Sequence, residues 1–180
     1  MKKIVGIPAR LGSSRFPGKP MCKILDYTMI EHCYIRSKLS KDIDDVFVAI
    51  CDDQLKRFCI EKNIKYIMTD PNIQRPSLRV SAACETLDLN DEDIVVVVQG
   101  DEPLVTPDMI SLSLKPLINN KHIHVSNLCY EISEKEMRDP NEIKVVMDNE
   151  SNALYMSRSP IPSVEPVSYT HLTLPTSPKV

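Results

Sequence analysis

Glycine is scarce in this chain. Only 4 of the 180 residues are glycine, which is about 2% where proteins average about 7%. They are Gly6, Gly12, Gly18 and Gly100. Because glycine permits tight turns and close approach to the backbone, its placement directs attention to two loops, one within residues 8–20 and one within residues 98–104.

The marks of a zinc site, a membrane protein or a nucleic-acid-binding protein are also missing. The six cysteines include no C-x-x-C pair, and no histidines stand at metal-ligand spacing, which argues against a zinc site. No apolar run approaches the roughly 18 residues that span a bilayer, and the apolar stretch after Met1 is too short for a signal peptide. The formal net charge of −3 gives no overall positive field for nucleic acid or an anionic membrane. We therefore expect a cytoplasmic protein with reduced thiols, no nucleic-acid partner and no membrane insertion.

What the chain does contain is an alternation of β-branched apolar runs with amphipathic segments. The patterns predict strands at 3–8, 45–50, 65–68 and 94–98, and helices at 28–39, after Asp52, at 77–87 and after Thr106. The run 94–98 is five β-branched residues without polar alternation, which predicts a central parallel strand. Short runs at 124–130, 143–147 and 153–156 indicate further strands. This order predicts an α/β protein, a Rossmann-like α/β/α sandwich with a mostly parallel central sheet.

The C-terminal end differs from the rest of the chain in its high proline content. Five of the 14 prolines fall in the last 22 residues, and a stretch so rich in proline does not form a regular element. We place one domain at residues 1–166, because the length and the 42% apolar content suit one core. Residues 167–180 are expected to be a disordered or non-native tail.

The first loop is rich in positive charge. Residues 1–25 carry six lysines and arginines and no acid. Arg10, Arg15 and Lys19 can grip phosphate oxygens, Ser13 can donate a hydroxyl, and Gly12 lets backbone amides approach. The loop matches neither G-x-x-x-x-G-K-[ST] nor G-x-G-x-x-G, which argues against a P-loop ATPase and a Rossmann dehydrogenase. Two interpretations stay open, a polyphosphate site and a solvated basic turn.

The second loop places Asp101 and Glu102 directly after the strand at 94–98. Mg²⁺ commonly binds through one or two carboxylates together with substrate phosphates, so one aspartate is chemically adequate. An acidic turn beside a helix is the alternative. The basic and acidic loops together predict a site for a metal and a nucleotide.

Four segments carry a resemblance to a known family. They are Ile7–Lys19, Val97–Pro103, Asp139–Val146 and Ser157–Pro162. From Lys3 to about Pro162 the chain resembles the 3-deoxy-manno-octulosonate (KDO) cytidylyltransferases, or CMP-KDO synthetases. The resemblance implies the nucleotide-diphospho-sugar transferase form of the fold. It also implies a nucleotidyltransferase that couples KDO to CTP with Mg²⁺, giving CMP-KDO and pyrophosphate for lipopolysaccharide biosynthesis.

The same resemblance implies roles for individual residues. Arg15, Lys19 and Asp101 would be catalytic, and Asp101 would bind Mg²⁺. Gln99 would face the nucleotide or the sugar. The full set of implied nucleotide-binding residues is Pro8, Ala9, Arg10, Gly12, Ser13, Arg15, Lys19, Arg75, Ser77 and Gln99.

The chain departs from the family pattern at Leu78, where an aspartate is usual, and at Ala82, where a glutamate is usual. Family members also continue beyond this chain, through a segment that supplies sugar contacts, a second metal carboxylate and much of a homodimer interface, so we expect the domain to be incomplete at its C-terminus. Two alternatives stay open: a cytidylyltransferase for another acidic sugar, and a truncated, catalytically inert nucleotide-binding fragment. For Lys144, a place near the site and an exposed place on a late strand both remain possible.

Overall fold

The computed structural model describes residues 1–12 and 16–162. It divides the chain into two compact units, Met1–Leu128 and Cys129–Val180, which are considered separately below. No helix in these described ranges is both long and apolar enough to cross a membrane. The assignment of residues 1–166 to one nucleotidyltransferase domain stays a prediction, and the expected tail at 167–180 lies outside the described residues.

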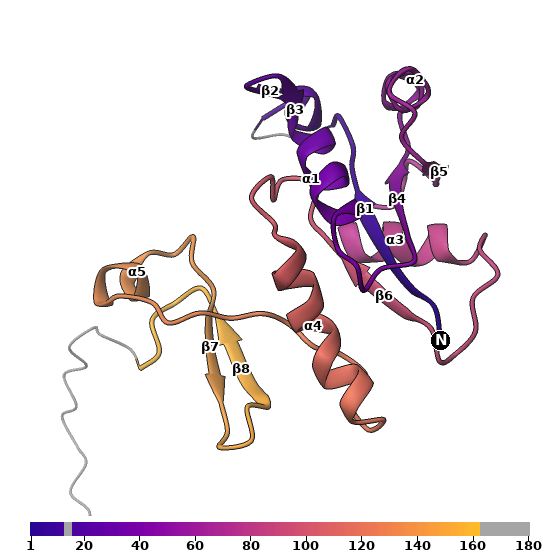
Figure 1. Cartoon of the computed structure of the whole chain (residues 1–180). Coiled ribbons are helices and arrows are strands. Elements are labelled where there is room, and N and C mark those ends of the chain that lie inside the picture. The colour runs from indigo at the N-terminus through magenta and orange to yellow at the C-terminus, as the bar shows by residue number, and fades with distance from the viewer. Residues whose placement is uncertain (13–15, 163–180) are drawn as a thin grey trace, which may run out of the picture. The chain divides into compact units, whose positions relative to one another are not determined.

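The first unit is built on a four-stranded parallel sheet (Figure 1). The strand order is β5-β4-β1-β6. The bounds are β1 Lys3–Pro8, β4 Asp45–Ile50, β5 Tyr66–Met68 and β6 Ile94–Val97. β1 lies in the middle and pairs in parallel with both β4 and β6. The sequence prediction of a mostly parallel sheet is confirmed.

Helices cover both faces of this sheet. They are α1 Met29–Lys38, α2 Asp53–Glu61, α3 Pro76–Cys84 and α4 Pro107–Asn119. One buried cluster joins the sheet to α1, α2 and α4, with Ile30, Leu55 and Ile110 among its members. A second joins the opposite face to α3 through Val80 and Ala83. The unit is therefore the α/β/α sandwich that the alternation of elements predicts.

Local sequence explains where the helices begin. Thr28 and Glu31 form a reciprocal capping box at α1, and Thr106 accepts a hydrogen bond from the amide of Met109 at α4. Such caps satisfy amides that have no partner within the helix. Asp52 precedes α2, yet its side chain makes no capping hydrogen bond. Its carboxylate serves the first loop instead, as described below.

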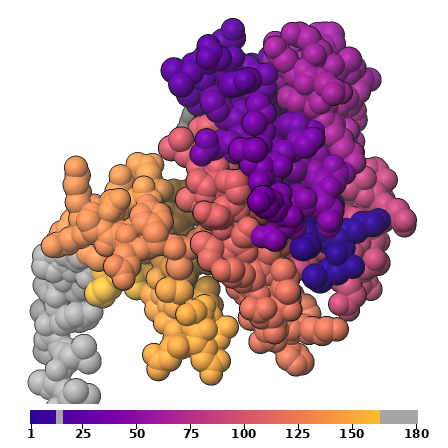
Figure 2. Space-filling view, in the orientation of Figure 1, coloured from indigo at the N-terminus to yellow at the C-terminus, as the bar shows by residue number. Residues whose placement is uncertain are grey.

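Three short elements connect β1 to α1. They are the 3₁₀ helix η1 at Lys19–Met21 and the two-stranded hairpin of β2 Lys23–Ile24 with β3 Tyr27–Thr28. Lys2, directly before β1, is hydrogen-bonded to the segment 88–93. The amide of Lys2 donates to Asp93 and its ammonium donates to the carbonyl of Asp88. The space-filling view shows the first residues lying beside this segment (Figure 2).

The strand predicted at 94–98 is confirmed as β6, but its predicted central position and the strand predicted at 124–130 are wrong. β6 is not central: within the described residues it pairs with β1 alone and forms the edge of the sheet. An apolar run indicates that both faces of a strand are suited to burial. It does not indicate whether one or two other strands pair with it. No strand forms at 124–130 either, although the composition favours one. There, Val125 is 84% exposed and Tyr130 66% exposed, and a strand without a pairing partner is not stable.

The second unit contains the helix α5 Glu134–Arg138 and the antiparallel pair β7 Lys144–Met147 and β8 Ala153–Ser157. These two strands confirm the predictions at 143–147 and 153–156. They form a sheet of their own within the described residues.

Candidate nucleotide-binding site

The candidate site lies where β1 and β6 end. The two strands are parallel neighbours, with Gly6 opposite Val97, so the loops that follow them leave the same edge of the sheet. The loops pack backbone to backbone, because a Cβ atom added to Gly100 would lie only 2.6 Å from the carbonyl oxygen of Pro8. This edge is where open α/β sheets bind ligands.

The structure brings the basic and acidic loops into direct contact. Lys19 Nζ donates to Asp101 Oδ2 at 2.5 Å. The pair stays accessible to solvent, with the lysine side chain 36% exposed and the aspartate side chain 48% exposed. A cation and a carboxylate that lie 82 residues apart in the sequence are therefore in direct contact.

Lys19 is positioned by a turn that needs glycine. Gly18 has a φ of 72°, a left-handed conformation that glycine adopts without steric penalty. Its amide donates to the carbonyl of Leu11 at 3.0 Å, and the amide of Lys19 donates to that of Phe16 at 3.3 Å. These bonds close the loop on itself and start η1 at Lys19. By contrast, a Cβ atom at Gly12 would meet no atom within 4 Å in the part of the chain that the structure describes.

Arg10 faces a third loop, the one between β5 and α3. Its Nη1 donates to Gln74 Oε1 at 2.7 Å. The amide of Leu11 donates to Asp52 Oδ2 at 3.0 Å, which is why that carboxylate does not cap α2. The amide of Ala9 donates to the carbonyl of Ala49 at 2.9 Å and is committed to the sheet.

A small cavity of about 40 Å³ lies between these loops. Its lining residues are Pro8, Ala9, Arg10, Gln74, Pro76 and Arg79. The structure thus gathers three of the predicted nucleotide-binding residues around one hollow.

Arg79, on α3, supports the loop between β5 and α3 through hydrogen bonds. It is only 2% exposed, and it donates to the hydroxyl of Thr69, to the carbonyl of Asp70 at 3.4 Å and to the carbonyl of Ile73 at 2.5 Å. A buried guanidinium with these partners is a support for the loop, because its donors are directed at the protein itself.

Two predicted nucleotide-binding residues at the start of α3 face solvent. Arg75, at the N-cap, and Ser77, in the first turn, are both exposed. Leu78, which replaces the usual aspartate, does not pack into the core and is 56% exposed. Ala82 is half-buried.

Helix α1 holds the acidic loop from the side. Cys33 Sγ donates to the carbonyl of Gln99 at 3.6 Å, and Arg36 Nε donates to the carbonyl of Val105 at 2.7 Å. Burial, with a smaller contribution from the nearby carboxylates of Asp101 and Glu102, raises the pKa of Cys33 from 9.0 to about 11. Cys33 is therefore a neutral thiol and not a nucleophile at physiological pH. Sequence reasoning missed both supports, since nothing local marks a contact across 66 to 69 residues.

The residues present fit a magnesium ion that is shared with phosphates. Asp101 is an accessible carboxylate on the acidic loop. The described ranges contain no group of three or more histidine, cysteine, aspartate and glutamate side chains that could hold a metal. Mg²⁺ typically uses one or two carboxylates and takes its other ligands from substrate phosphates and water. Ser13 and Arg15, the remaining predicted phosphate contacts, lie outside the described residues.

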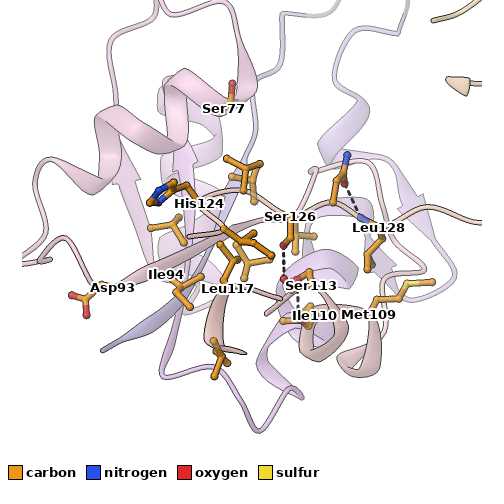
Figure 3. Close-up of a pocket in the computed structure, with 18 of the residues that line it drawn as sticks. Ser77, Asp93, Ile94, Met109, Ile110, Ser113, Leu117, His124, Ser126 and Leu128 are labelled. Carbon is orange, nitrogen blue, oxygen red and sulfur yellow. Dashed lines mark hydrogen bonds between the residues drawn. The ribbon is translucent and has the colours of Figure 1, made fainter. Parts of the chain in front are cut away.

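A much larger cavity lies on the open edge of β6 (Figure 3). Its volume is about 970 Å³, and β6, α4 and the segment 121–128 line it. The close-up shows Ile94, Ile110 and Leu117 among its walls, together with the hydrogen bond from Ser126 to the carbonyl of Ser113. Most lining residues are apolar, and the charged ones are four acids and one lysine, Lys121, so this cavity does not offer the cluster of cations that a triphosphate needs.

In the second unit, Lys144 has a structural role. It is 4% exposed, so the prediction of an exposed lysine is wrong. Its Nζ donates to the carbonyls of Asp139 at 2.5 Å, Glu142 at 2.8 Å and Arg158 at 2.7 Å. Arg158 in turn donates to the carbonyls of Pro140 and Asn141. The matched segments 139–146 and 157–162 are thus tied to each other.

Comparisons with known proteins agree with this geometry. Residues 4–168 match the family model described as cytidylyltransferase. The 8-amino-3,8-dideoxy-manno-octulosonate cytidylyltransferase of Shewanella frigidimarina is 42% identical over 168 residues, covering 90% of this chain and 67% of the relative. The enzyme of the same name from Shewanella sediminis is 42% identical over 162 residues, covering 87% of this chain and 64% of the relative. The chain spans about two thirds of the length of these curated relatives.

Solved structures similar to this chain also include a synthetase in complex with CTP and a cytidylyltransferase. The structure of CMP:2-keto-3-deoxy-manno-octonic acid synthetase complexed with CTP superimposes with a TM-score of 0.85 at 33% identity, covering 92% of this chain and 68% of that one. A cytidylyltransferase from Leptospira borgpetersenii superimposes with a TM-score of 0.58 at 27% identity, covering 68% of this chain and 52% of that one. The expected α/β nucleotidyltransferase fold is confirmed.

Proposed function

Because this chain belongs to the cytidylyltransferase family, we propose that it transfers CMP from CTP to an acidic octulosonate sugar and releases pyrophosphate. The observation that carries the proposal is the contact of Lys19 with Asp101. The contact joins the cation that we assign to phosphate binding and the carboxylate that we assign to metal binding, at the edge where open α/β sheets bind ligands. This pairing of charges is what the transfer of a nucleotidyl group requires.

In this reaction the anomeric hydroxyl oxygen of the sugar attacks the α-phosphorus of CTP, and the hydroxyl proton is released to water. The bond from the α-phosphorus to its bridging oxygen breaks, and the electron pair leaves with pyrophosphate. No covalent intermediate with the protein is needed. Lys19 stabilises negative charge on the departing phosphates, and the loops closed by Gly18 and Gly100 fix the geometry.

Asp101 would hold Mg²⁺, which when bound polarises phosphoryl oxygens and offsets their charge. Pro8 and Ala9 line the small cavity beside the third loop, and we assign their backbone to the recognition of cytosine. Arg10, which lines the same cavity, we assign to the triphosphate. Gln99 follows β6, and we assign it to the nucleotide or the sugar. Gly12, Ser13, Arg15, Arg75 and Ser77 complete the proposed nucleotide-binding set.

The sugar has two candidates. KDO is the first, and the CTP-complexed structure similar to this chain is that of a synthetase named for this sugar. The 8-amino sugar is the second, and it is supported by the names of relatives that are 42% identical. Either product would serve lipopolysaccharide biosynthesis, and we propose that the reaction takes place in the cytoplasm with a homodimeric full-length protein.

Pyrophosphate release measured with CTP, Mg²⁺ and each sugar in turn tests the proposal. We expect turnover with at least one octulosonate, and the ratio of kcat/KM for the two sugars identifies the substrate. Asp101→Asn is expected to lower the turnover rate by a factor of about 10²–10³. The control, Asp108→Asn, also replaces an aspartate by asparagine, but in the first turn of α4, and is expected to leave the rate unchanged. The absence of turnover with both sugars, in a chain that binds CTP, would support the inert nucleotide-binding fragment instead.

A further inference from the structure

The Lys19–Asp101 contact joins two groups that the proposed function needs to be apart. The lysine is assigned to the triphosphate and the carboxylate to a divalent cation. Lys19 Nζ lies 2.5 Å from Asp101 Oδ2, within the space that a cation bound to this oxygen would occupy. Two positive centres so close together repel each other strongly. The ammonium and the cation therefore exclude one another from Asp101.

We propose that Lys19, besides its contact with the phosphates, blocks Asp101 from binding a divalent cation until a triphosphate is present. This inference rests on the proposed function. The phosphates carry more negative charge than one carboxylate, so they draw the ammonium away from Asp101. Asp101 then becomes a cation ligand, and the phosphates supply further oxygen ligands. Nucleotide and cation consequently strengthen each other's binding.

The local structure allows this exchange without a change in the backbone. The amide of Lys19 is held by the carbonyl of Phe16 at 3.3 Å, and the acidic loop is held where Gly100 meets Pro8. Only the two side chains need to move. Both are accessible to solvent, and exposed ion pairs of this kind are weak enough for a triphosphate to displace.

The surroundings of Asp101 also favour coupling over independent cation binding. The described ranges hold no group of three or more acidic, histidine or cysteine side chains that could bind a metal. One carboxylate that is already paired with an ammonium is a poor ligand for a free cation. The cation therefore needs the nucleotide to complete its coordination.

Binding of Mn²⁺ without nucleotide, measured by water-proton relaxation, tests the proposal directly. Lys19→Met removes the competing ammonium. Mn²⁺ then no longer has to break the exposed Lys19–Asp101 ion pair or bind beside a second positive charge, so its binding is expected to tighten roughly threefold to tenfold. Lys19→Arg keeps a cation on the carboxylate and is expected to match the unmodified chain. Lys23→Met removes one charge from β2 nearby and is expected to have no effect.

A double variant shows where the added Mn²⁺ binds. Lys19→Met with Asp101→Asn is expected to lose the gain completely. If Lys19→Met binds Mn²⁺ no more tightly than the unmodified chain, or if the gain survives Asp101→Asn, the proposal is overturned.

Parallel titration of the unmodified chain with CTP and Mg²⁺ separates the two claims. CTP binding together with an unchanged Mn²⁺ affinity in Lys19→Met overturns the inference and leaves the proposed function intact. An absence of CTP binding overturns both.

Discussion

Gly100 and Pro8 touch through their backbones, and this contact fixes the distance between the two loops of the candidate site. A Cβ atom on Gly100 would lie 2.6 Å from the carbonyl oxygen of Pro8, a separation at which one of the loops must shift. The carbonyl belongs to the backbone and cannot rotate away as a side chain would.

Gly100→Ala is accordingly expected to destabilise the protein by about 1–3 kcal/mol, as overpacking at a rigid contact does, and to weaken CTP binding at least tenfold. Thermal unfolding and calorimetry measure the two effects. Gly12→Ala is the matched control for stability, because a Cβ atom at Gly12 meets none of the described residues within 4 Å. Equal melting temperatures for the two variants would show that the loops are not held by this contact.

Arg79 supports the third loop of the site. Arg79→Met is expected to lower the free energy of unfolding by about 2–4 kcal/mol, because it removes charged hydrogen bonds from the Thr69 hydroxyl and from the carbonyls of Asp70 and Ile73. Urea denaturation provides the measurement. Arg75→Met, at an exposed position four residues earlier, should stay within about 0.5 kcal/mol of the unmodified chain. A similar loss in both variants would contradict a specific role for Arg79.

Lys144 holds the second unit together. Lys144→Met keeps most of the side-chain volume but leaves three carbonyls without their charged donor, and a loss of about 2–4 kcal/mol is expected. Hydrogen exchange of the amides in β7 should accelerate, while exchange in β1 should not. The exposed Lys135 on α5 supplies the control, Lys135→Met. Unchanged exchange in β7 of Lys144→Met would refute this role.

Two buried thiols predict how stability changes with pH. Burial raises the pKa of Cys33 and that of Cys59 from an ordinary value of 9.0 to about 11. Between these values the folded protein keeps both protons and the unfolded chain releases them. Their contribution is therefore fully present below pH 9 and is lost as the pH rises toward 11, by up to about 1.4 kcal/mol per pH unit for each thiol.

Denaturation measured at pH 8, 9 and 10 checks this dependence. Cys59→Ala should flatten the decline between pH 9 and 10, whereas Cys129→Ala, at an exposed cysteine, should leave it unchanged. An identical slope in all three proteins would mean that the thiols do not contribute.

The sequence predicts much of the first unit because its elements are marked locally. β1, β4 and α1 are found within one or two residues of their expected bounds, since β-branched runs and the Thr28 cap are local signals. The sheet order is not local. The position of β6 at an edge depends on which strands lie beside it, and the run Ile94–Val97 carries no mark of that.

The candidate site shows the same division. The charges of Lys19 and Asp101 are evident in the sequence, and their meeting follows from the pairing of β1 with β6. The supports are not evident. Arg36 donates to the carbonyl of Val105 across 69 residues, and Arg79 donates to Thr69, Asp70 and Ile73 on the third loop. Support contacts depend on tertiary packing, which periodicity does not encode.

The central claim is that the loops after β1 and β6 form a site for CTP and a divalent cation. Calorimetric titration of the chain with CTP, with and without Mg²⁺, and with GTP and ATP in parallel, tests it most directly. The account predicts binding that is selective for CTP, strengthened by Mg²⁺, and no longer strengthened by Mg²⁺ in Asp101→Asn. A folded chain that binds none of the three nucleotides, or binds them equally with no response to Mg²⁺, would contradict it.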